Sequence, residues 1–146
     1  MLSTNTPVTH LDDARSWEFL AAQQVGRLVT HVGGEPEIFP VNFTVADGRI
    51  VLRTGEGTKL FCVAVDSRVA FEADSWDAEG GTSVVARGEA RELTSSDDIA
   101  WAEALPLRPW VPTTKTHWIA IDVTAISGRA FHFGPEPEPE PPVGDD

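Results

Sequence analysis

The sequence predicts a mainly β protein in which six or seven antiparallel strands form a barrel, accompanied by two or three short helices. The first observation is a pair of turn sequences, Gly33-Gly34 and Asp47-Gly48, that join three apolar segments. Such residues tolerate the positive φ values that two-residue hairpin turns require. The second is the alternation of apolar and polar residues over 68–74 and 83–93, which is typical of half-buried strands. Sheets of this size generally roll up to cover their edges.

The elements are expected in the following order. An amphipathic helix over residues 12–24 is indicated by apolar residues at helical spacing, which are Ala14, Trp17, Leu20 and Ala21. The expected strands cover residues 25–32, 37–45, 49–54, 68–74, 83–93, 117–123 and 127–133. The first three would form a meander. A short helix is expected over residues 60–65, and another from Ser95 or Ser96, whose hydroxyl can cap free amides, to about Leu105.

The length of 146 residues fits one domain. We assign residues 11–133 to this domain and residues 1–10, which are polar and lack periodicity, to a flexible leader. Residues 134–146 contain the proline-rich, acidic run GPEPEPEPP. Such a segment buries too little apolar surface to order itself, so we expect a disordered, solvated tail.

Charge and composition exclude several classes of protein. A net charge of −12 opposes binding to nucleic acid, which depends on basic residues. The single cysteine, Cys62, forms no intramolecular disulfide, and we find neither a signal peptide nor an apolar run that could cross a membrane. We therefore expect a cytoplasmic protein without a membrane partner. The four histidines lack ligand spacing, so no metal site is expected, and no GxSxG sequence supports a hydrolase.

The two turns also predict which side chains share a face. With two-residue loops, Arg27 lies across from Pro40, Thr44 across from Val51, and Asn42 across from Arg53. One face then carries Arg27, Pro40, Asn42, Thr44 and Arg53. The other is expected to form the core, with Leu28, Phe39, Val41, Phe43, Val45, Ile50 and Leu52.

The segment Thr54–Lys59, TGEGTK, directly follows the third strand and leads into a helix. Free backbone amides at a helix N-terminus attract anions. A lysine in the first turn is unfavourably placed against the helix dipole unless a negative group lies beside it. Lys59 therefore indicates a phosphate site, with pairing to Glu56 inside the loop as the alternative.

The order of VGRL, PVNF, RTGEGTKL, RVAFEAD and VVARGEA resembles the pyridoxamine 5′-phosphate oxidase-like, FMN-binding split-barrel proteins over residues 11–133. The resemblance implies an antiparallel split barrel that binds FMN, or a deazaflavin coenzyme, at the interface of a homodimer. Trp110 would come from the neighbouring subunit and lie near the flavin ring. The cofactor-binding residues it implies are Pro40, Val41, Asn42, Phe43, Arg53, Thr54, Gly55, Thr58, Lys59 and Trp110.

The resemblance further implies an oxidoreductase that transfers a hydride between the flavin and a small organic substrate. Its catalytic residues are not assigned. The alternative is a non-catalytic protein of the same fold that binds or stores a cofactor, haem or lipid. True pyridoxamine phosphate oxidases end in a substrate-binding stretch with an RLxP pattern, whereas this chain ends in the acidic tail. Oxidation of pyridoxamine phosphate is therefore not expected.

Overall fold

The computed structural model describes residues 6–139 and 141–144. Residues 1–5 of the expected leader, and Glu140, Asp145 and Asp146 of the expected tail, lie outside this range. The strands are β1 (Val8–Leu11), β2 (Val25–Val32), β3 (Glu35–Asn42), β4 (Thr44–Ala46), β5 (Arg49–Thr54), β6 (Arg68–Trp76), β7 (Gly80–Leu93) and β8 (His117–His132). The helices are α1 (Asp13–Ala21), α2 (Thr58–Val65) and α3 (Ser96–Glu103).

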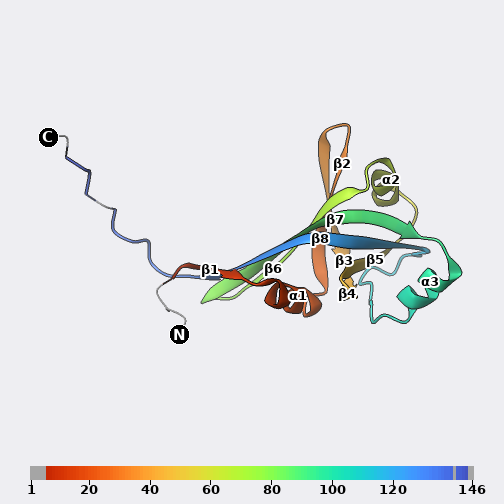
Figure 1. Cartoon of the computed structure of the whole chain (residues 1–146), viewed down its shortest axis with the longest axis horizontal. Helices are drawn as coiled ribbons and strands as arrows, with labels where there is room; N and C mark the ends of the chain where they lie inside the picture. The colour runs from red at the N-terminus through yellow and green to blue at the C-terminus, as the bar shows by residue number, and fades with distance from the viewer. Residues whose placement is uncertain (1–5, 140, 145–146) are drawn as a thin grey trace.

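All eight strands belong to one antiparallel sheet with the order β3-β2-β6-β7-β8-β5-β4, while β1 pairs with the far half of β8 (Figure 1). The two ends of this order, β3 and β4, are separated in the chain only by Phe43. The sheet therefore curls back on itself although its two end strands are not hydrogen-bonded neighbours. This arrangement confirms the predicted split barrel.

The strand registers at the two turns are confirmed, but the three strands do not form the predicted meander. Arg27 pairs with Pro40 and Thr44 pairs with Val51, as expected. The expected pairing of Asn42 with Arg53 is wrong, because the strand breaks at Phe43. The amide of Phe43 donates a hydrogen bond to the carbonyl of Gln24 at 3.1 Å, and this break directs β3 and β4 to opposite ends of the sheet.

The two ends of the chain also differ from expectation. The leader is not wholly loose, because β1 lies within it and pairs with β8 from Val8 opposite Phe131 to Leu11 opposite Gly128. Backbone pairing of this kind needs no apolar periodicity. The two strands expected over residues 117–123 and 127–133 form one continuous strand, β8. Its pairing with β7 continues through the expected break because the register shifts between Arg87 and Gly88.

The predicted core face is confirmed. Phe43 packs edge-to-face on Phe71, with ring centroids 4.7 Å apart. The main core also buries Leu20, Leu28, Val41, Ile50, Leu52, Val63, Val84, Ile119 and Ile121. A second cluster on the opposite face of the sheet places Val51, Leu93, Trp118 and Ala120 against Ala102 of α3. That helix begins as predicted, because the Ser95 hydroxyl accepts a hydrogen bond from the Asp98 amide at 3.1 Å.

Helix α1 is shorter than predicted, and only Trp17 and Leu20 of its predicted apolar stripe pack against the core. Ser16 and Leu20 are buried, whereas Ala14 and Ala21 are exposed.

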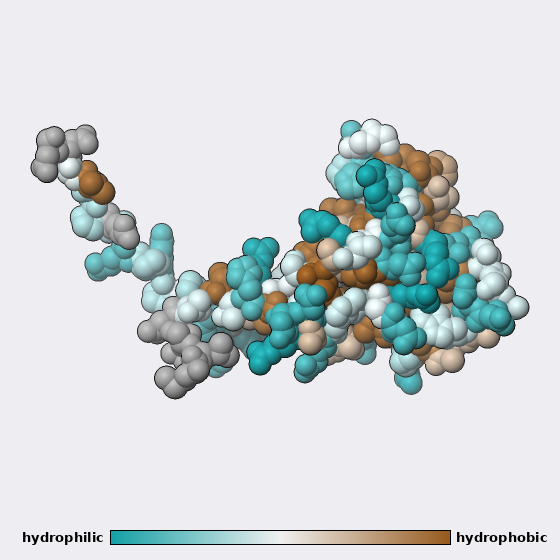
Figure 2. All heavy atoms as spheres, in the orientation of Figure 1, coloured by the Kyte–Doolittle hydropathy of each residue, from teal (hydrophilic) through white to brown (hydrophobic). Residues whose placement is uncertain are grey.

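The described residues of the tail leave the far end of β8 and stand away from the body, and they are largely hydrophilic (Figure 2). No helix in the described part of the chain is long and apolar enough to cross a membrane.

The close approach of β7 to β8 at Gly88 gives a test of the fold. A Cβ atom at this position would overlap the carbonyl oxygen of Asp122 on β8. We expect Gly88→Ala to lower the free energy of unfolding by about 1–3 kcal/mol, the usual cost of forcing extra atoms into a packed site. Gly134→Ala, where the added atom meets nothing within 4 Å, should change it by less than about 0.5 kcal/mol. Equal stability of both variants in urea denaturation would contradict this packing.

Candidate functional site

A cavity of about 360 Å³ opens where β3 and β5 end. Its walls come from three segments: the end of β3, the glycine loop (residues 54–59), and the strap (residues 104–116) that connects α3 to β8. The lining residues are Pro40, Val41, Asn42, Arg53, Thr54, Gly55, Glu56, Lys59, Leu107, Pro109, Val111, Thr113, Thr114 and Lys115. A cavity built from segments so distant in sequence depends on the fold of the whole barrel.

Two glycines let the chain turn from β5 into α2. A Cβ atom on Gly55 would lie 2.9 Å from the carbonyl oxygen of Thr114 in the strap, so only glycine allows this close approach. Gly57 precedes α2 with a φ of 148°, a conformation that glycine adopts most readily. These constraints explain why the loop needs both glycines.

The N-terminus of α2 has no side-chain cap. The first hydrogen bond of the helix runs from the Phe61 amide to the Gly57 carbonyl at 3.1 Å, so the amides of Thr58, Lys59 and Leu60 precede the regular helical ladder. A second cavity of about 220 Å³ lies beside them, and it shares Thr54, Glu56 and Lys59 with the first. An anion here would meet both free amides and the positive end of the helix dipole.

Arg53 and Lys59 bring positive charge to the cavity. The guanidinium carbon of Arg53 lies 5.2 Å from the Trp118 ring centroid, and Lys59 Nζ lies 5.7 Å from the Phe39 ring centroid. Among the described residues, neither cation has a carboxylate within ion-pair distance. The alternative partner for Lys59, Glu56, instead has a carboxylate oxygen 3.6 Å from His117 Nε2.

Arg27, which was expected on the same face, does not add to this charge. Its guanidinium contacts Glu72 at 3.0 Å and Asp74 at 3.3 Å. Burial, together with the neighbouring Asp74, raises the pKa of Glu72 to about 7. Arg27 thus has two carboxyl groups in direct contact, whereas Arg53 and Lys59 have none among the described residues.

The strap is attached to the barrel through Asn42. The Asn42 Oδ1 atom accepts a hydrogen bond from the Trp110 amide at 2.8 Å, and its Nδ2 donates to the Gln24 carbonyl at 3.3 Å. Inside the strap, Lys115 Nζ donates to the Val111 carbonyl and to Thr113 Oγ1, both at 2.6 Å. The ammonium of Lys115 thus holds the strap in shape as well as lining the cavity.

Most of the residues expected in the site meet at these cavities. Pro40, Val41, Asn42, Arg53, Thr54, Gly55 and Lys59 line the first cavity, and Thr58 lines the second. Phe43 lies in the core instead. The Trp110 side chain is 64% exposed, while its neighbours Pro109 and Val111 line the cavity. Sequence reasoning missed the rest of the strap, although Lys115, one of only two lysines, was a signal.

His117 stands at the rim of the barrel, opposite Thr54 on β5. Its Nδ1 lies 2.7 Å from Glu92 Oε2 and its Nε2 lies 3.6 Å from Glu56 Oε1. The hydrogen bond with Glu92, followed by the charges of Glu92 and Glu56, raises the pKa of the imidazole above its usual value. His117 therefore connects β7 and β8 with the glycine loop.

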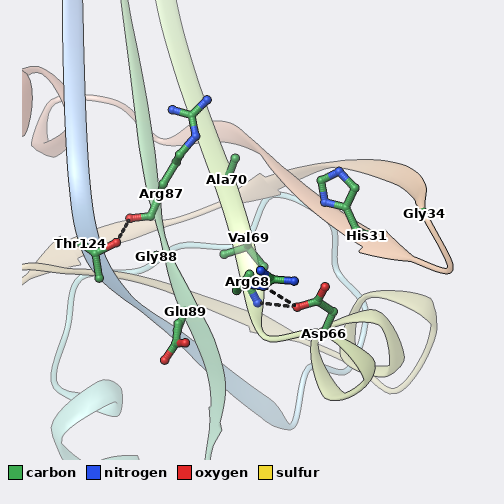
Figure 3. A pocket seen from close by; sticks show the side chains of 10 residues that line it. All are labelled: His31, Gly34, Asp66, Arg68, Val69, Ala70, Arg87, Gly88, Glu89 and Thr124. Atoms are coloured by element: carbon green, nitrogen blue, oxygen red, sulfur yellow. Dashed lines mark hydrogen bonds and ion pairs between the residues drawn. The ribbon is translucent and has the colours of Figure 1, made fainter.

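A larger cavity of about 720 Å³ lies on the outer face of the sheet, between the β2–β3 turn and strands β6 to β8 (Figure 3). In it, Arg68 pairs with Asp66 at 3.5 Å and also donates its amide to that carboxylate. The remaining lining residues are His31, Gly34, Val69, Ala70, Arg87, Gly88, Glu89 and Thr124. Its acidic and basic groups are mixed and no helix N-terminus lines it, so it is less suited to a phosphate than the smaller cavity.

Comparison with known proteins agrees with the fold. The family model of pyridoxamine 5′-phosphate oxidase matches residues 12–130. The chain therefore belongs to this family. An uncharacterised protein of Mycobacterium tuberculosis is 42% identical over 95 residues, which cover 64% of this chain and 86% of the relative.

Two solved structures have similar sequences and folds. A candidate pyridoxamine 5′-phosphate oxidase of Corynebacterium glutamicum is 40% identical with a TM-score of 0.82, over 90% of this chain and 98% of that one. An FAD-binding protein of Mycobacterium smegmatis is 41% identical with a TM-score of 0.76, over 86% of this chain and 99% of that one. A haem-binding protein of the same species, at 20% identity, shares the fold alone.

The bond between Asn42 and the strap can be tested by hydrogen exchange. We expect Asn42→Ala to increase amide exchange across residues 104–116, because the Trp110 amide loses its acceptor. Asn42→Asp keeps a side-chain oxygen at the same place and should retain more of the protection. Identical exchange of the strap in the wild type and Asn42→Ala would show that this hydrogen bond does not hold it.

Proposed function

We propose that the protein binds a flavin nucleotide, with the flavin phosphate held by Arg53, Lys59 and the first amides of α2. The observation that carries this proposal is the charge arrangement at the glycine loop. In a chain with 23 acidic and 11 basic residues, two cations without a described carboxylate partner, Arg53 and Lys59, line the cavity beside an uncapped helix N-terminus. An anionic ligand would use both features together.

The donors available fit the phosphate of such a ligand. Arg53 and Lys59 supply charge-assisted donors, the Thr58 hydroxyl lies at the start of α2, and Gly57 leaves open space beside it. The ribityl chain and ring would follow the part of the cavity lined by Pro40, Val41 and Asn42 toward the strap. When bound, the flavin supplies the redox chemistry, a hydride transfer to or from a small organic molecule.

We propose FMN as the ligand, with a deazaflavin coenzyme as the alternative. The FAD-binding relative from Mycobacterium smegmatis, at 41% identity, supports a flavin. Because FAD contains the FMN unit, a phosphate site at the glycine loop would serve either nucleotide. Parallel titrations with FMN, FAD and the deazaflavin coenzyme distinguish the three, and an absorption spectrum of the purified protein would reveal a flavin or haem that remains bound.

We also propose that the cavity is completed by a second copy of the chain. Trp110 and Val111, beside the cavity, are 64% and 58% exposed, and Phe61 on α2 is 61% exposed. Figure 2 shows hydrophobic surface over the part of the body where α2 lies. Exposed apolar patches of this kind mark interaction surfaces, and a homodimer would bring the Trp110 side chain of one copy toward the flavin of the other.

The dimer is tested by sedimentation equilibrium of the full chain. We expect a mass of twice 15.8 kDa. We expect the charged variant Trp110→Glu to shift the protein toward single chains, because a carboxylate is costly to bury in an apolar interface. A mass of 15.8 kDa at all concentrations would contradict a shared site.

The phosphate site is tested by Lys59→Ala. We expect this change to weaken FMN binding at least about tenfold, or about 1.4 kcal/mol, while the melting temperature of the protein without flavin stays nearly the same. Riboflavin, which lacks the phosphate, should bind the wild type and the variant with similar affinity. Flavin fluorescence titration measures both ligands.

The matched control is Arg129→Ala, which removes an exposed cation from the far half of β8. It makes the net charge of −12 more negative by one unit, as Lys59→Ala does, without touching the glycine loop. Equal weakening of FMN binding in the two variants would mean that Lys59 acts only through the overall charge. Unchanged binding in Lys59→Ala would remove the lysine from the site.

A further inference from the structure

Glu56 is unexpectedly placed for a residue in a phosphate site. It is the one acidic residue that lines either cavity within the described part of the chain, and it lines both. It stands between Gly55 and Gly57, in the middle of the glycine loop. A free carboxylate here would repel the phosphate that Arg53 and Lys59 attract. The site therefore needs a way to neutralise Glu56.

His117 is placed to do this. Its Nδ1 is fixed by Glu92 at 2.7 Å, and its Nε2 faces Glu56 at 3.6 Å. The imidazole is 22% exposed and the Glu92 carboxylate 34% exposed, whereas the Glu56 side chain is 87% exposed. The His117–Glu92 pair is thus a partly buried anchor on the sheet, and Glu56 is the exposed partner that reaches it from the loop.

We propose that His117 is a positioning residue for the flavin phosphate: its protonated imidazole, shared with Glu92, draws the Glu56 carboxylate toward the barrel rim, which offsets part of that negative charge and holds the glycine loop open for the phosphate. This inference rests on the proposed flavin function. The groups that face His117 in the described structure are Glu92 from β7 and Glu56 from the loop, with Thr54 opposite on β5. Among the cations of the cavity, Lys115 lies two residues earlier and is engaged inside the strap.

The direction of the pH dependence follows from the charges. Glu92 and Glu56 raise the pKa of His117, so the contact with Glu56 is fully present below the ordinary histidine value of about 6.5 and is lost as the pH rises through the raised value. Above it, neutral His117 leaves Glu56 uncompensated beside the phosphate. By linkage, FMN bound at the glycine loop must raise the pKa of His117 further.

The experiment compares FMN affinities of the wild type, His117→Gln and Glu56→Gln from about pH 6 to about pH 9, the range around a raised histidine pKa. The phosphate of FMN also ionises near the lower end of this range, so each variant is compared with the wild type at the same pH. Riboflavin is the ligand without a phosphate. His31→Gln is the matched control, because His31 is exposed and lines the larger cavity on the outer face of the sheet.

We expect His117→Gln to bind FMN at least about fivefold more weakly than the wild type at low pH, with the difference vanishing at high pH. Glu56→Gln should match the wild type at low pH and bind FMN more tightly at high pH. His31→Gln should follow the wild type throughout, and riboflavin should show none of these differences. An affinity ratio of His117→Gln to the wild type that is constant across the range would overturn the role of His117.

A second measurement does not depend on the folding of any variant. NMR titration of the wild-type histidine ring protons, with and without saturating FMN, should show an upward shift of the His117 pKa and no shift for His31. Bound FMN with an unchanged His117 pKa would refute this inference and leave the flavin assignment intact. A wild type that binds neither FMN nor FAD at any pH would refute both.

Discussion

The antiparallel pairing of β8 with β5 on one side and β7 on the other is the constraint on which the rest of the structure depends. It aligns Thr54 with His117 and brings Glu92 beside them at one rim of the barrel. The glycine loop leaves the sheet from this rim, so its start is fixed by ladder hydrogen bonds. The strap enters β8 at the same rim and therefore covers the loop. One strand thus positions both walls of the cavity.

The second determinant is the distribution of charge. Acidic residues outnumber basic ones by 23 to 11, and Arg27, Arg49 and Arg91 form ion pairs with acidic neighbours. Arg53 and Lys59 lie over aromatic rings, without a carboxylate partner among the described residues, and both line the cavity beside the uncapped end of α2. Two cations are thereby available where we propose that a phosphate binds. The same environment gives the Glu56 carboxylate its significance, because it must be offset by His117.

Sequence patterns predicted those features that depend on residues close together in the chain. The turns at Gly33-Gly34 and Asp47-Gly48 gave the correct hairpin registers, and Lys59, which the dipole argument singled out, lines both cavities beside α2. The break at Phe43 could not be predicted, because it depends on a hydrogen bond to Gln24 and on packing against Phe71. Apart from Trp110, the residues of the strap were not predicted for the same reason: its attachment through Asn42 joins residues far apart in the chain. Alternation also could not reveal β1, whose partner strand lies at the other end of the sequence.

A crystal structure of the protein grown with FMN would show directly whether the glycine loop holds the phosphate of a flavin nucleotide. We expect phosphate density within hydrogen-bond distance of Lys59 Nζ and the first amides of α2, with the Arg53 guanidinium beside it. Flavin bound with its phosphate elsewhere, for example in the larger cavity lined by Arg68 and Arg87, would contradict this expectation.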